Sequence, residues 1–507
     1  MHGNSKGVKL AGKEIRLQYT GYIIFAAKMV SIATGLAFQY LIARSTTKPE
    51  YDIFFNLGDI LLYFTLLAGV VPFWVMRCVA RGKAGATKTG LAINLIFSTV
   101  STIAYLAIIP FVLPGLGISN WTAYLPVYLL VSVQITELYL FGLFEPCLQA
   151  VKPQSIGYGL LVQQVVKVVL GYVLIVQFGQ PLMGAVAATI IAFALQISYY
   201  FKLTASEFKQ NIQWGYVKEW LKGSVLNIYS VAGGVIANFI FILLFSLGGE
   251  GSRGIYGAAA QIANIVTYAS FLSFALYPKL LAEKKSEDVT ASLKTVLMFA
   301  LPMTVGAIAL ANSYIILLRV ELAEFQGAAL VLVVLALDAL VTVISGIYGS
   351  VLFGVESVDQ EKMSIKSLVR SRLFKFFSLS YLHSAITIPT TYFVLTTFAY
   401  QQPLAAALSV CVINSTVRFA MFIVMVFMLR GTFKIVIPWR SIGKYLLAST
   451  VMGAVLYLLP YSSMISTTLI WTAIGGVVYL SVLMLIDKET RALPKSILHE
   501  LSRKKKD

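Results

Sequence analysis

Three basic residues lie deep within long hydrophobic runs, where water cannot solvate a charge. Lys28 lies near the middle of the run from Thr20 to Ala43, and Lys167 and Arg418 lie near the centres of two later runs. A lysine or arginine at the centre of a bilayer costs about 2.5–3.5 kcal/mol on insertion scales, so each side chain must face protein, water or a ligand. Arginine can make a bidentate contact with phosphate, and lysine acts as a compact point charge. These residues predict a cationic cavity that binds a phosphate or pyrophosphate group.

The alternative interpretation of these cations is structural. They could pair with buried carboxylates, and Lys28 could extend its ammonium group toward the cytoplasmic interface. Three carboxylates within the hydrophobic runs are candidate partners, namely Asp59, Glu137 and Asp338. Each could be a counter-ion to one of the cations, a proton-coupling site or a solvated residue that lines a cavity. The sequence does not choose among these roles.

Residues that usually form catalytic or metal sites are scarce and scattered. The three histidines and three cysteines show no ligand-type spacing, and no glycine-rich loop of the Walker type is present. We therefore expect no catalytic residue, no bound metal, no cofactor and no enzymatic activity.

The overall composition indicates a polytopic membrane protein. The chain has 507 residues, of which 58% are hydrophobic and only 12% are charged, and its mean hydropathy is +0.81. The run from Thr20 to Ala43 is long enough to cross the roughly 30 Å hydrocarbon layer. It is also too long for the apolar region of a signal peptide, so we expect it to remain as a transmembrane helix.

The hydrophobic runs predict an all-α protein with about fourteen transmembrane helices. They lie at approximately 20–43, 52–76, 89–113, 122–144, 157–178, 181–201, 222–247, 255–278, 295–318, 326–352, 373–398, 404–429, 441–459 and 466–486. We expect two six-helix lobes, at 1–204 and 222–430, joined by a cytoplasmic linker at 205–221. Two additional helices at 431–487 and a basic cytoplasmic tail at 488–507 complete the chain.

The basic residues are distributed unevenly among the connections. Most of the 40 Lys and Arg lie at the two ends and in the even-to-odd connections. The alternate loops hold Arg44, Lys48, Arg253 and Arg319. By the positive-inside rule, we expect both termini to be cytoplasmic. We expect the membrane to be the plasma membrane. The net charge of +18 is therefore explained by attraction to anionic membrane lipids, and we expect no nucleic-acid partner.

A weak internal repeat supports the two lobes. In the first half, Tyr51 precedes a span that ends at Ala80-Arg81-Gly82-Lys83, and in the second half Tyr256 precedes a span that ends at Ala282-Glu283-Lys284-Lys285. Such repeats are typical of transporters built from two homologous bundles, with the substrate site between them.

The six plus six plus two arrangement resembles a known family of transporters. Together with the segment from Gly69 through Arg77 to Ala80 and the motif Ala275-Leu276-Tyr277-Pro278, it is similar to Wzx-like polysaccharide-transport flippases. These belong to the multidrug/oligosaccharidyl-lipid/polysaccharide (MOP) exporter superfamily. The resemblance implies that the protein flips a lipid-linked oligosaccharide for surface glycan or glycoprotein assembly, with glycan-assembly enzymes as candidate partners. The three deep cations fit a pyrophosphate-linked substrate.

Two other functions remain open. A cation-coupled drug exporter of the same superfamily would centre on buried carboxylates, and Asp59 and Asp338 keep it open. A membrane-embedded glycosyltransferase or polymerase would need an acid or base, and usually a metal, at the outer face. The predicted outward loops, such as 115–120 and 400–402, are too short to supply a convincing site.

Overall fold

The computed structural model describes most of the 507-residue chain. The described residues are 9–10, 13–14, 17–80, 82–118, 120–152, 154–273, 286–318, 327–355, 371–430, 433, 435–460, 464–487 and 490–491. The Ala275-Leu276-Tyr277-Pro278 motif and the basic tail lie outside them. Contacts divide the chain into two compact units, Met1–Gly254 with Asp359–Ala406 and Ile255–Val358 with Ala407–Asp507. This division differs from the lobe boundaries expected at 205–221, and the two six-helix lobes remain a prediction.

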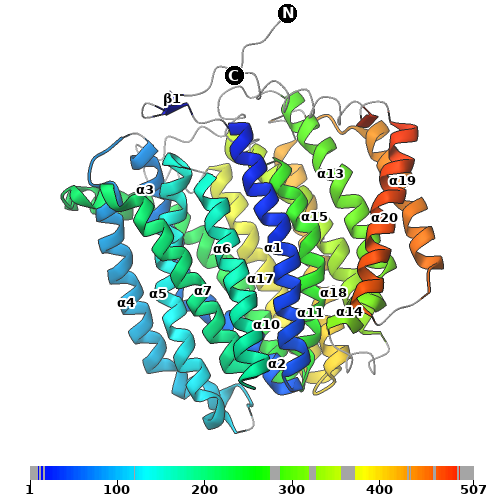
Figure 1. The fold of residues 1–507 in the computed structure, drawn as a ribbon, viewed down its shortest axis with the longest axis horizontal. Helices are drawn as coiled ribbons and strands as arrows, with labels where there is room; N and C mark the ends of the chain where they lie inside the picture. Colours follow the sequence, from blue (N-terminus) through cyan, green and yellow to red (C-terminus); the bar gives the residue numbers. More distant parts are fainter. Residues whose placement is uncertain are drawn as a thin grey trace, which may run out of the picture. The chain divides into compact units, whose positions relative to one another are not determined.

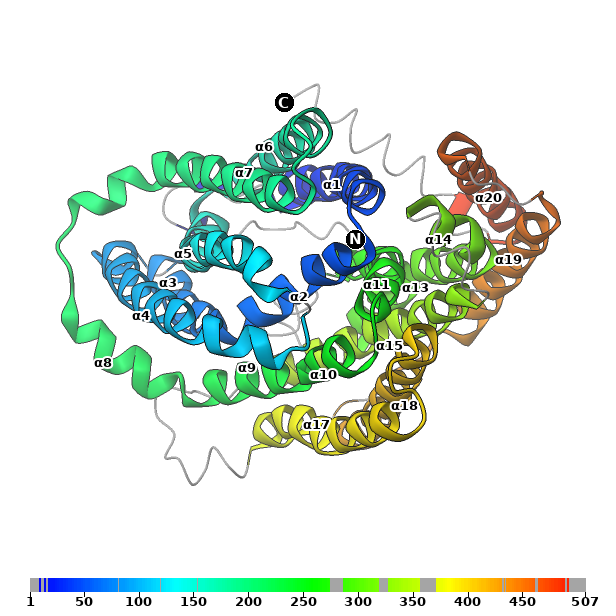
Figure 2. The same ribbon diagram turned by 90° about the horizontal axis from the view of Figure 1, so that it is seen from below.

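The first unit is built almost entirely from helices (Figure 1). Its elements are α1 (Leu17–Ser45), α2 (Lys48–Phe64), η1 (Leu66–Gly69), α3 (Val70–Ala80), α4 (Ala86–Gly115), α5 (Trp121–Val151), α6 (Gln154–Gly171), η2 (Tyr172–Gln177), α7 (Pro181–Thr204), η3 (Ala205–Lys209), α8 (Trp214–Gly223), α9 (Val225–Ala237), α10 (Phe239–Leu247) and α17 (Arg372–Thr397). Two paired two-residue strands, β1 (Lys9–Leu10) and β2 (Lys13–Glu14), precede α1. Helix α1 packs against α6 and α7, and α17 packs against α9 and α10 (Figure 2).

The second unit is also helical. Its elements are α11 (Ser252–Thr267), whose first turn belongs to the first unit, η4 (Tyr268–Ser273), α13 (Ser286–Ala309), α14 (Ala311–Leu318), α15 (Ala328–Val355), α18 (Pro403–Leu429), whose first turn likewise belongs to the first unit, α19 (Trp439–Leu458) and α20 (Ile465–Ile486). Helix α13 packs against α15 and α19, and α19 packs against α20. The hydroxyl of Tyr479 donates to the carbonyl of Met298 at 2.5 Å within this core.

The predicted all-α fold is confirmed, and the described residues of each of the fourteen predicted spans fall on a helix or a broken helix. Within the described part of the chain, eleven helices are long and apolar enough to cross a membrane, or twelve if α2 and the helix after it form one bent span. Helices α1 and α17 correspond to two further predicted spans but are not among these. The number of fourteen spans therefore stays a prediction.

The second predicted span is broken rather than straight. Helix α2 and the segment from Leu66 to Val79 differ in direction by 62°. Pro72 has no N–H group, so the carbonyl of Ala68 cannot receive its helical hydrogen bond. The side chains of Tyr139 and Asn227 donate to carbonyls on either side, at Phe64 and Gly69, both at 3.3 Å. The break is thus stabilised by polar groups from α5 and α9.

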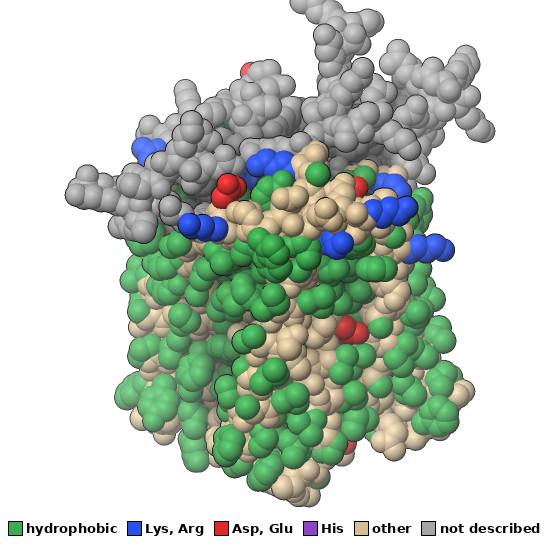
Figure 3. All heavy atoms as spheres, turned by 90° about the vertical axis from the view of Figure 1, so that its left-hand side faces the viewer, with side chains coloured by type: hydrophobic (Ala, Val, Ile, Leu, Met, Phe, Trp, Pro, Cys, Tyr) green, Lys and Arg blue, Asp and Glu red, His purple; other side chains and the backbone are tan. Residues whose placement is uncertain are grey.

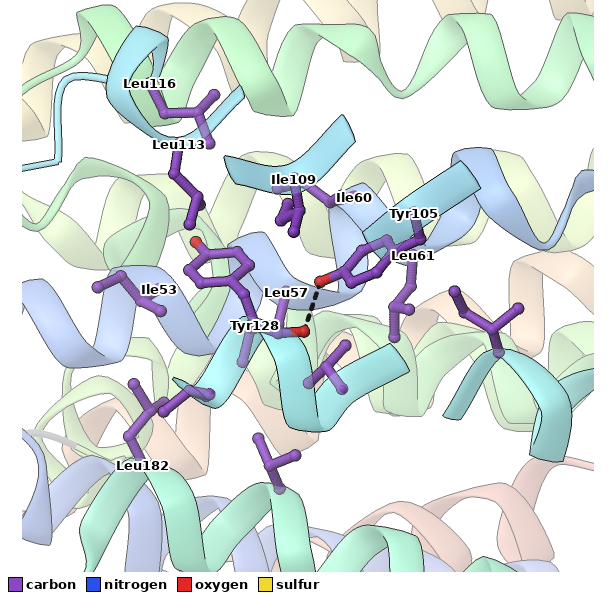
Figure 4. Packing of buried hydrophobic residues seen from close by; sticks show 14 of the residues in the cluster. Ile53, Leu57, Ile60, Leu61, Tyr105, Ile109, Leu113, Leu116, Tyr128 and Leu182 are labelled. Atoms are coloured by element: carbon purple, nitrogen blue, oxygen red, sulfur yellow. Dashed lines mark hydrogen bonds between the residues drawn. The ribbon is translucent and has the colours of Figure 1, made fainter. Parts of the chain in front are cut away.

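The core of the first unit is formed mainly by side chains of α2, α4 and α5 (Figure 4). Tyr105 and Tyr128 are fully buried there, and the hydroxyl of Tyr105 donates to the carbonyl of Tyr128 at 2.9 Å. The hydroxyl of Tyr128 in turn donates to Asn56 at 2.7 Å. A buried hydroxyl without a partner would cost free energy, so these bonds determine how α2 meets α5.

Candidate functional site

Lys167 lies at the contact between α1 and α6. Its Nζ lies 5.1 Å from the centroid of the Phe38 ring. An alanine at Gly171 would place its Cβ 2.7 Å from that ring, so the close approach of Phe38 to α6 depends on glycine there. Lys167 makes no ion pair or hydrogen bond with any residue that the structure describes. A desolvated cation–π contact provides about 2 kcal/mol and so offsets only part of the cost of a charge at this depth.

The polar surroundings of Lys167 extend along the same seam. Thr34 of α1 donates to Gln164 of α6 at 3.3 Å, and Gln163 is buried. Thr34 contacts Gln164, and further along both helices Phe38 contacts Lys167. Because the residue numbers rise together on α1 and α6, the two helices run parallel. The face of α6 that carries Gln164 and Lys167 therefore meets α1.

Lys28 lies on α1 of this seam, and its side chain is outside the described residues. Lys28 precedes Thr34 by six residues, or roughly 9 Å along the helix. On α6, Lys167 follows Gln164, the residue that Thr34 contacts, by three residues or roughly 4.5 Å. The backbone positions of the two lysines therefore differ by roughly 13 Å in depth.

Arg418 of the second unit has a carboxylate partner. Its Nη1 lies 2.5 Å from Oδ2 of Asp338 on α15, and it also donates to Thr342 at 3.2 Å. The Asp338 side chain is 7% exposed and that of Arg418 is 39% exposed. No described residue accepts from Nε or Nη2 of Arg418, so these donors remain available to a ligand. The structure thus shows Asp338 as the counter-ion of Arg418.

The same two helices contact each other two turns earlier. The thiol of Cys411 lies 3.7 Å from the carbonyl of Val331. Cys411 precedes Arg418 by seven positions, and Val331 precedes Asp338 by seven positions. The polar face of α18 therefore meets α15, and the two helices run parallel.

Asp59 pairs with Arg253, which was expected in an outward loop. Oδ2 of Asp59 accepts from Nε of Arg253 at 2.6 Å, and Oδ1 accepts from Nη2 at 2.8 Å. Both side chains are about nine-tenths buried. The guanidinium also lies over the rings of Phe55 and Phe241, at 5.1 and 4.7 Å. This is a bidentate, desolvated ion pair between α2 and the first turn of α11.

A second carboxylate of α2 supports that arrangement. The carboxylate of Asp52 accepts from the backbone N–H groups of Gly251 and Gly254, each at 2.5 Å. These groups lie at the beginning of α11, where unpaired N–H groups and the helix dipole favour an anion. Gly251 has φ +94°, a conformation that disfavours other residues. Asp52 therefore positions the turn that carries Arg253.

Sequence reasoning missed Arg253 because its position along the chain is that of a loop between two spans. The available signal was the spacing of Asp52, Asn56 and Asp59 on one face of α2, since two deep carboxylates require a cation or hydrogen-bond donors nearby. Arg253 is the cation that meets this requirement. The polar face of α2 is an anchor between helices.

Glu137 differs from the other carboxylates. It lies on α5 with 7% of its surface exposed, and its Oε2 has no hydrogen-bond partner in the described part of the chain. A buried carboxylate without a partner is costly when ionised. Glu137 is thus suited to hold a proton or to meet a cation.

The six predicted site residues are therefore distributed over several places. Lys28 and Lys167 belong to neighbouring helices of the first unit, and Arg418 belongs to the second unit. Whether the three cations form one cavity stays a prediction. No group of three or more His, Cys, Asp or Glu among the described residues could hold a metal ion.

No family model matches this sequence, and no curated protein matches it. Solved structures do resemble it. A lipid II flippase MurJ, in an inward closed conformation, has a TM-score of 0.59 and 16% identity, over 92% of this chain and 98% of that chain. The chain has the fold of MOP-superfamily transporters.

Two other transporters of this superfamily have similar structures. An inward-facing multidrug resistance MATE family transporter has a TM-score of 0.58 and 13% identity, over 80% of this chain and 97% of that chain. A MOP superfamily transporter from Pyrococcus furiosus, described as having a binding pocket of reverse polarity, has a TM-score of 0.55 and 15% identity, over 80% of this chain and 95% of that chain. Both a flippase and a multidrug resistance transporter thus have this fold.

Proposed function

We propose that this protein flips a lipid-linked oligosaccharide, joined to its lipid through pyrophosphate, across the plasma membrane, with both termini in the cytoplasm. The observation that carries the proposal is Lys167, a deep cation with an aromatic neighbour and no carboxylate partner among the described residues. An anionic headgroup that enters the seam would supply the missing negative charge. Hydrocarbon cannot solvate a sugar phosphate, so such a substrate needs a polar, cationic route.

The depths of the two lysines suggest how the headgroup moves. With the N-terminus in the cytoplasm, Lys28 lies nearer the inner leaflet and Lys167 lies deeper. Because their backbone positions are roughly 13 Å apart, a phosphate group would meet Lys28 first and Lys167 later. Lysine suits this transfer because a point charge on a flexible chain can follow a moving anion.

Arg418 contributes differently in this proposal. Asp338 already neutralises part of its charge, and Thr342 further restrains one nitrogen. The free donors at Nε and Nη2 can contact phosphate or sugar hydroxyl groups. Arg418 therefore recognises the headgroup in the second unit without being a lone cation.

A cation-coupled exporter is the second candidate, and Glu137 is the residue that favours it. The carboxylates first expected to serve such an exporter, Asp59 and Asp338, are both paired with arginines. Glu137, in contrast, is buried and has no arginine partner among the described residues. It is the carboxylate best suited to exchange a proton or bind a coupling cation.

The test is flipping of a fluorescent lipid-linked oligosaccharide in proteoliposomes. The variants are Lys28→Ala, Lys167→Ala and Arg418→Ala, with Lys152→Ala as the matched control because Lys152 is exposed in the turn between α5 and α6. Loss of the ion–phosphate contact at Lys167 should lower the rate at least tenfold, while Lys152→Ala should flip as wild type does.

The outcomes separate the candidates. If the wild type flips the lipid and the Lys28→Ala, Lys167→Ala and Arg418→Ala variants are all fully active, the proposed phosphate-binding site is rejected. If the wild type does not flip but exports cationic drugs in a sodium or proton gradient, the second candidate replaces the first. Glu137→Gln should then abolish export, because the amide cannot be ionised.

A further inference from the structure

The segment at 205–221, which was expected to be a cytoplasmic linker between lobes, is folded onto the first unit. Trp220 is buried in a cluster that includes Trp74 and Cys147. The indole N–H of Trp74 donates to Ser224 at 2.7 Å, and the backbone N–H of Gln213 donates to Thr89 at 2.8 Å. Helix α8 therefore has one face held firmly against α3 and α4.

The opposite face of α8 carries a stripe of exposed apolar side chains. Trp214 is 59% exposed, Leu221 is 44% exposed and Val225, at the start of α9, is 52% exposed. Their spacing of seven and four residues places them on one side of a helical path. Lys218, four residues after Trp214, lies on the same side and is exposed. Nothing in the described chain covers this stripe.

The orientation of α8 favours a membrane surface as its partner. Helix α8 lies across the ends of neighbouring helices of the first unit, whereas α4 and α7 run along the bundle (Figures 1 and 2). An amphipathic helix in this position lies in the plane of a bilayer interface, with tryptophan at the headgroup level.

Charge specifies the kind of lipid. Exposed basic side chains on α8, on the segment before it and at the α3–α4 turn are Lys218, Lys209 and Lys83. Nζ of Lys83 lies 5.8 Å from the ring centroid of Tyr216 on α8. Glu207 and Glu219 are the acidic residues of the same segment, so the local balance is basic. Figure 3 shows Lys and Arg side chains in a band along the edge of the apolar surface on this face of the first unit.

We propose that α8 is an interfacial helix that binds anionic phospholipids of the cytoplasmic leaflet. Trp214, Leu221 and Val225 lie among the upper acyl chains and glycerol groups. Lys209 and Lys218 contact the phosphate groups. The other side of α8 supports this interaction, because Trp220 is buried against α3 and α4 and the residue before α8, Gln213, donates to Thr89 of α4. It does not depend on the transported substrate.

The test measures which lipids contact Trp214 in the full-length protein. The protein is reconstituted in mixtures of phosphatidylcholine and phosphatidylglycerol, one of which carries brominated acyl chains that quench tryptophan fluorescence. Subtracting the signal of Trp214→Phe isolates Trp214 from the other tryptophans. Lys209→Gln and Lys218→Gln are compared with Lys375→Gln, an exposed lysine of α17.

We expect brominated lipid to quench Trp214 and brominated phosphatidylglycerol to bind in preference to brominated phosphatidylcholine. Each lysine neutralised should lower that preference up to about fivefold, and Lys375→Gln should not change it. Quenching of Trp214 by aqueous acrylamide but not by brominated lipid would overturn the proposal. Equal quenching by the two lipids, unaffected by Lys209→Gln and Lys218→Gln, would overturn the anionic specificity.

Discussion

Two arginine–aspartate pairs, one in each unit, show how similar residues perform different tasks. Arg253 and Asp59 make two hydrogen bonds, and both side chains are about nine-tenths buried. Arg418 binds Asp338 through Nη1 alone and keeps 39% of its side chain exposed. The first pair is enclosed by the protein, whereas Nε and Nη2 of Arg418 meet no acceptor among the described residues. Burial and the number of bonds, rather than residue type, distinguish a closed anchor from a pair that keeps donors accessible.

The largest expected effect comes from breaking the buried pair. Arg253→Ala or Asp59→Ala leaves a desolvated charge without its partner, which should lower the free energy of unfolding by about 3–5 kcal/mol. The measurement is unfolding of the detergent-solubilised protein by denaturant, followed by tryptophan fluorescence. The double variant Asp59→Leu with Arg253→Met removes both charges and should be close to wild type. Single variants as stable as wild type would contradict the assignment of this pair as an anchor.

In the second pair, removing Arg418 and removing Asp338 should lower the free energy of unfolding by different amounts. Arg418→Ala leaves the buried carboxylate of Asp338 unpaired and should destabilise the protein by about 3 kcal/mol. Asp338→Asn leaves a partly exposed arginine and should cost about 1 kcal/mol. Under the proposed function, Asp338→Asn also keeps most flipping activity, because the arginine that contacts the headgroup remains. Equal losses of stability in the two variants would show that Arg418 is as enclosed as Arg253.

The smallest effect is expected at a third pair, near the end of α20. Burial alone would raise the pKa of Asp487, but hydrogen bonds from Lys444 and Thr490 outweigh it and hold the pKa below its ordinary value of 3.8. This carboxylate therefore stabilises the folded state fully at neutral pH. Its contribution falls as the pH drops below 3.8 and disappears as the pH passes through the lower folded-state pKa.

Because the Lys444 side chain is 40% exposed, the pair should contribute no more than about 1 kcal/mol. Asp487→Asn should lower the melting temperature slightly at pH 7 and not at pH 2, as measured by thermal unfolding with intrinsic fluorescence. High salt should reduce the difference at pH 7, which it should not do for Asp59→Ala. An equal loss for Asp487→Asn at both pH values would point to packing rather than charge.

Several features followed from the sequence because they depend on local periodicity. Each predicted hydrophobic run corresponds to a helix or a broken helix, since a chain in hydrocarbon must satisfy its own backbone groups. Lys167 and Arg418 lie on polar helix faces that meet neighbouring helices, because residues three and four apart share one side of a helix.

The partners of these residues were decided by tertiary structure. Asp59 and Arg253 are separated by 194 positions in the chain, and nothing local to either residue indicates the pairing. The deep carboxylates looked equivalent in sequence, yet two have arginine partners and Glu137 has none among the described residues. The segment at 205–221 was predicted to be a cytoplasmic linker, but Trp220 is buried against α3 and α4. A sequence can show that a buried charge needs a partner, whereas which group supplies that partner depends on how distant helices pack.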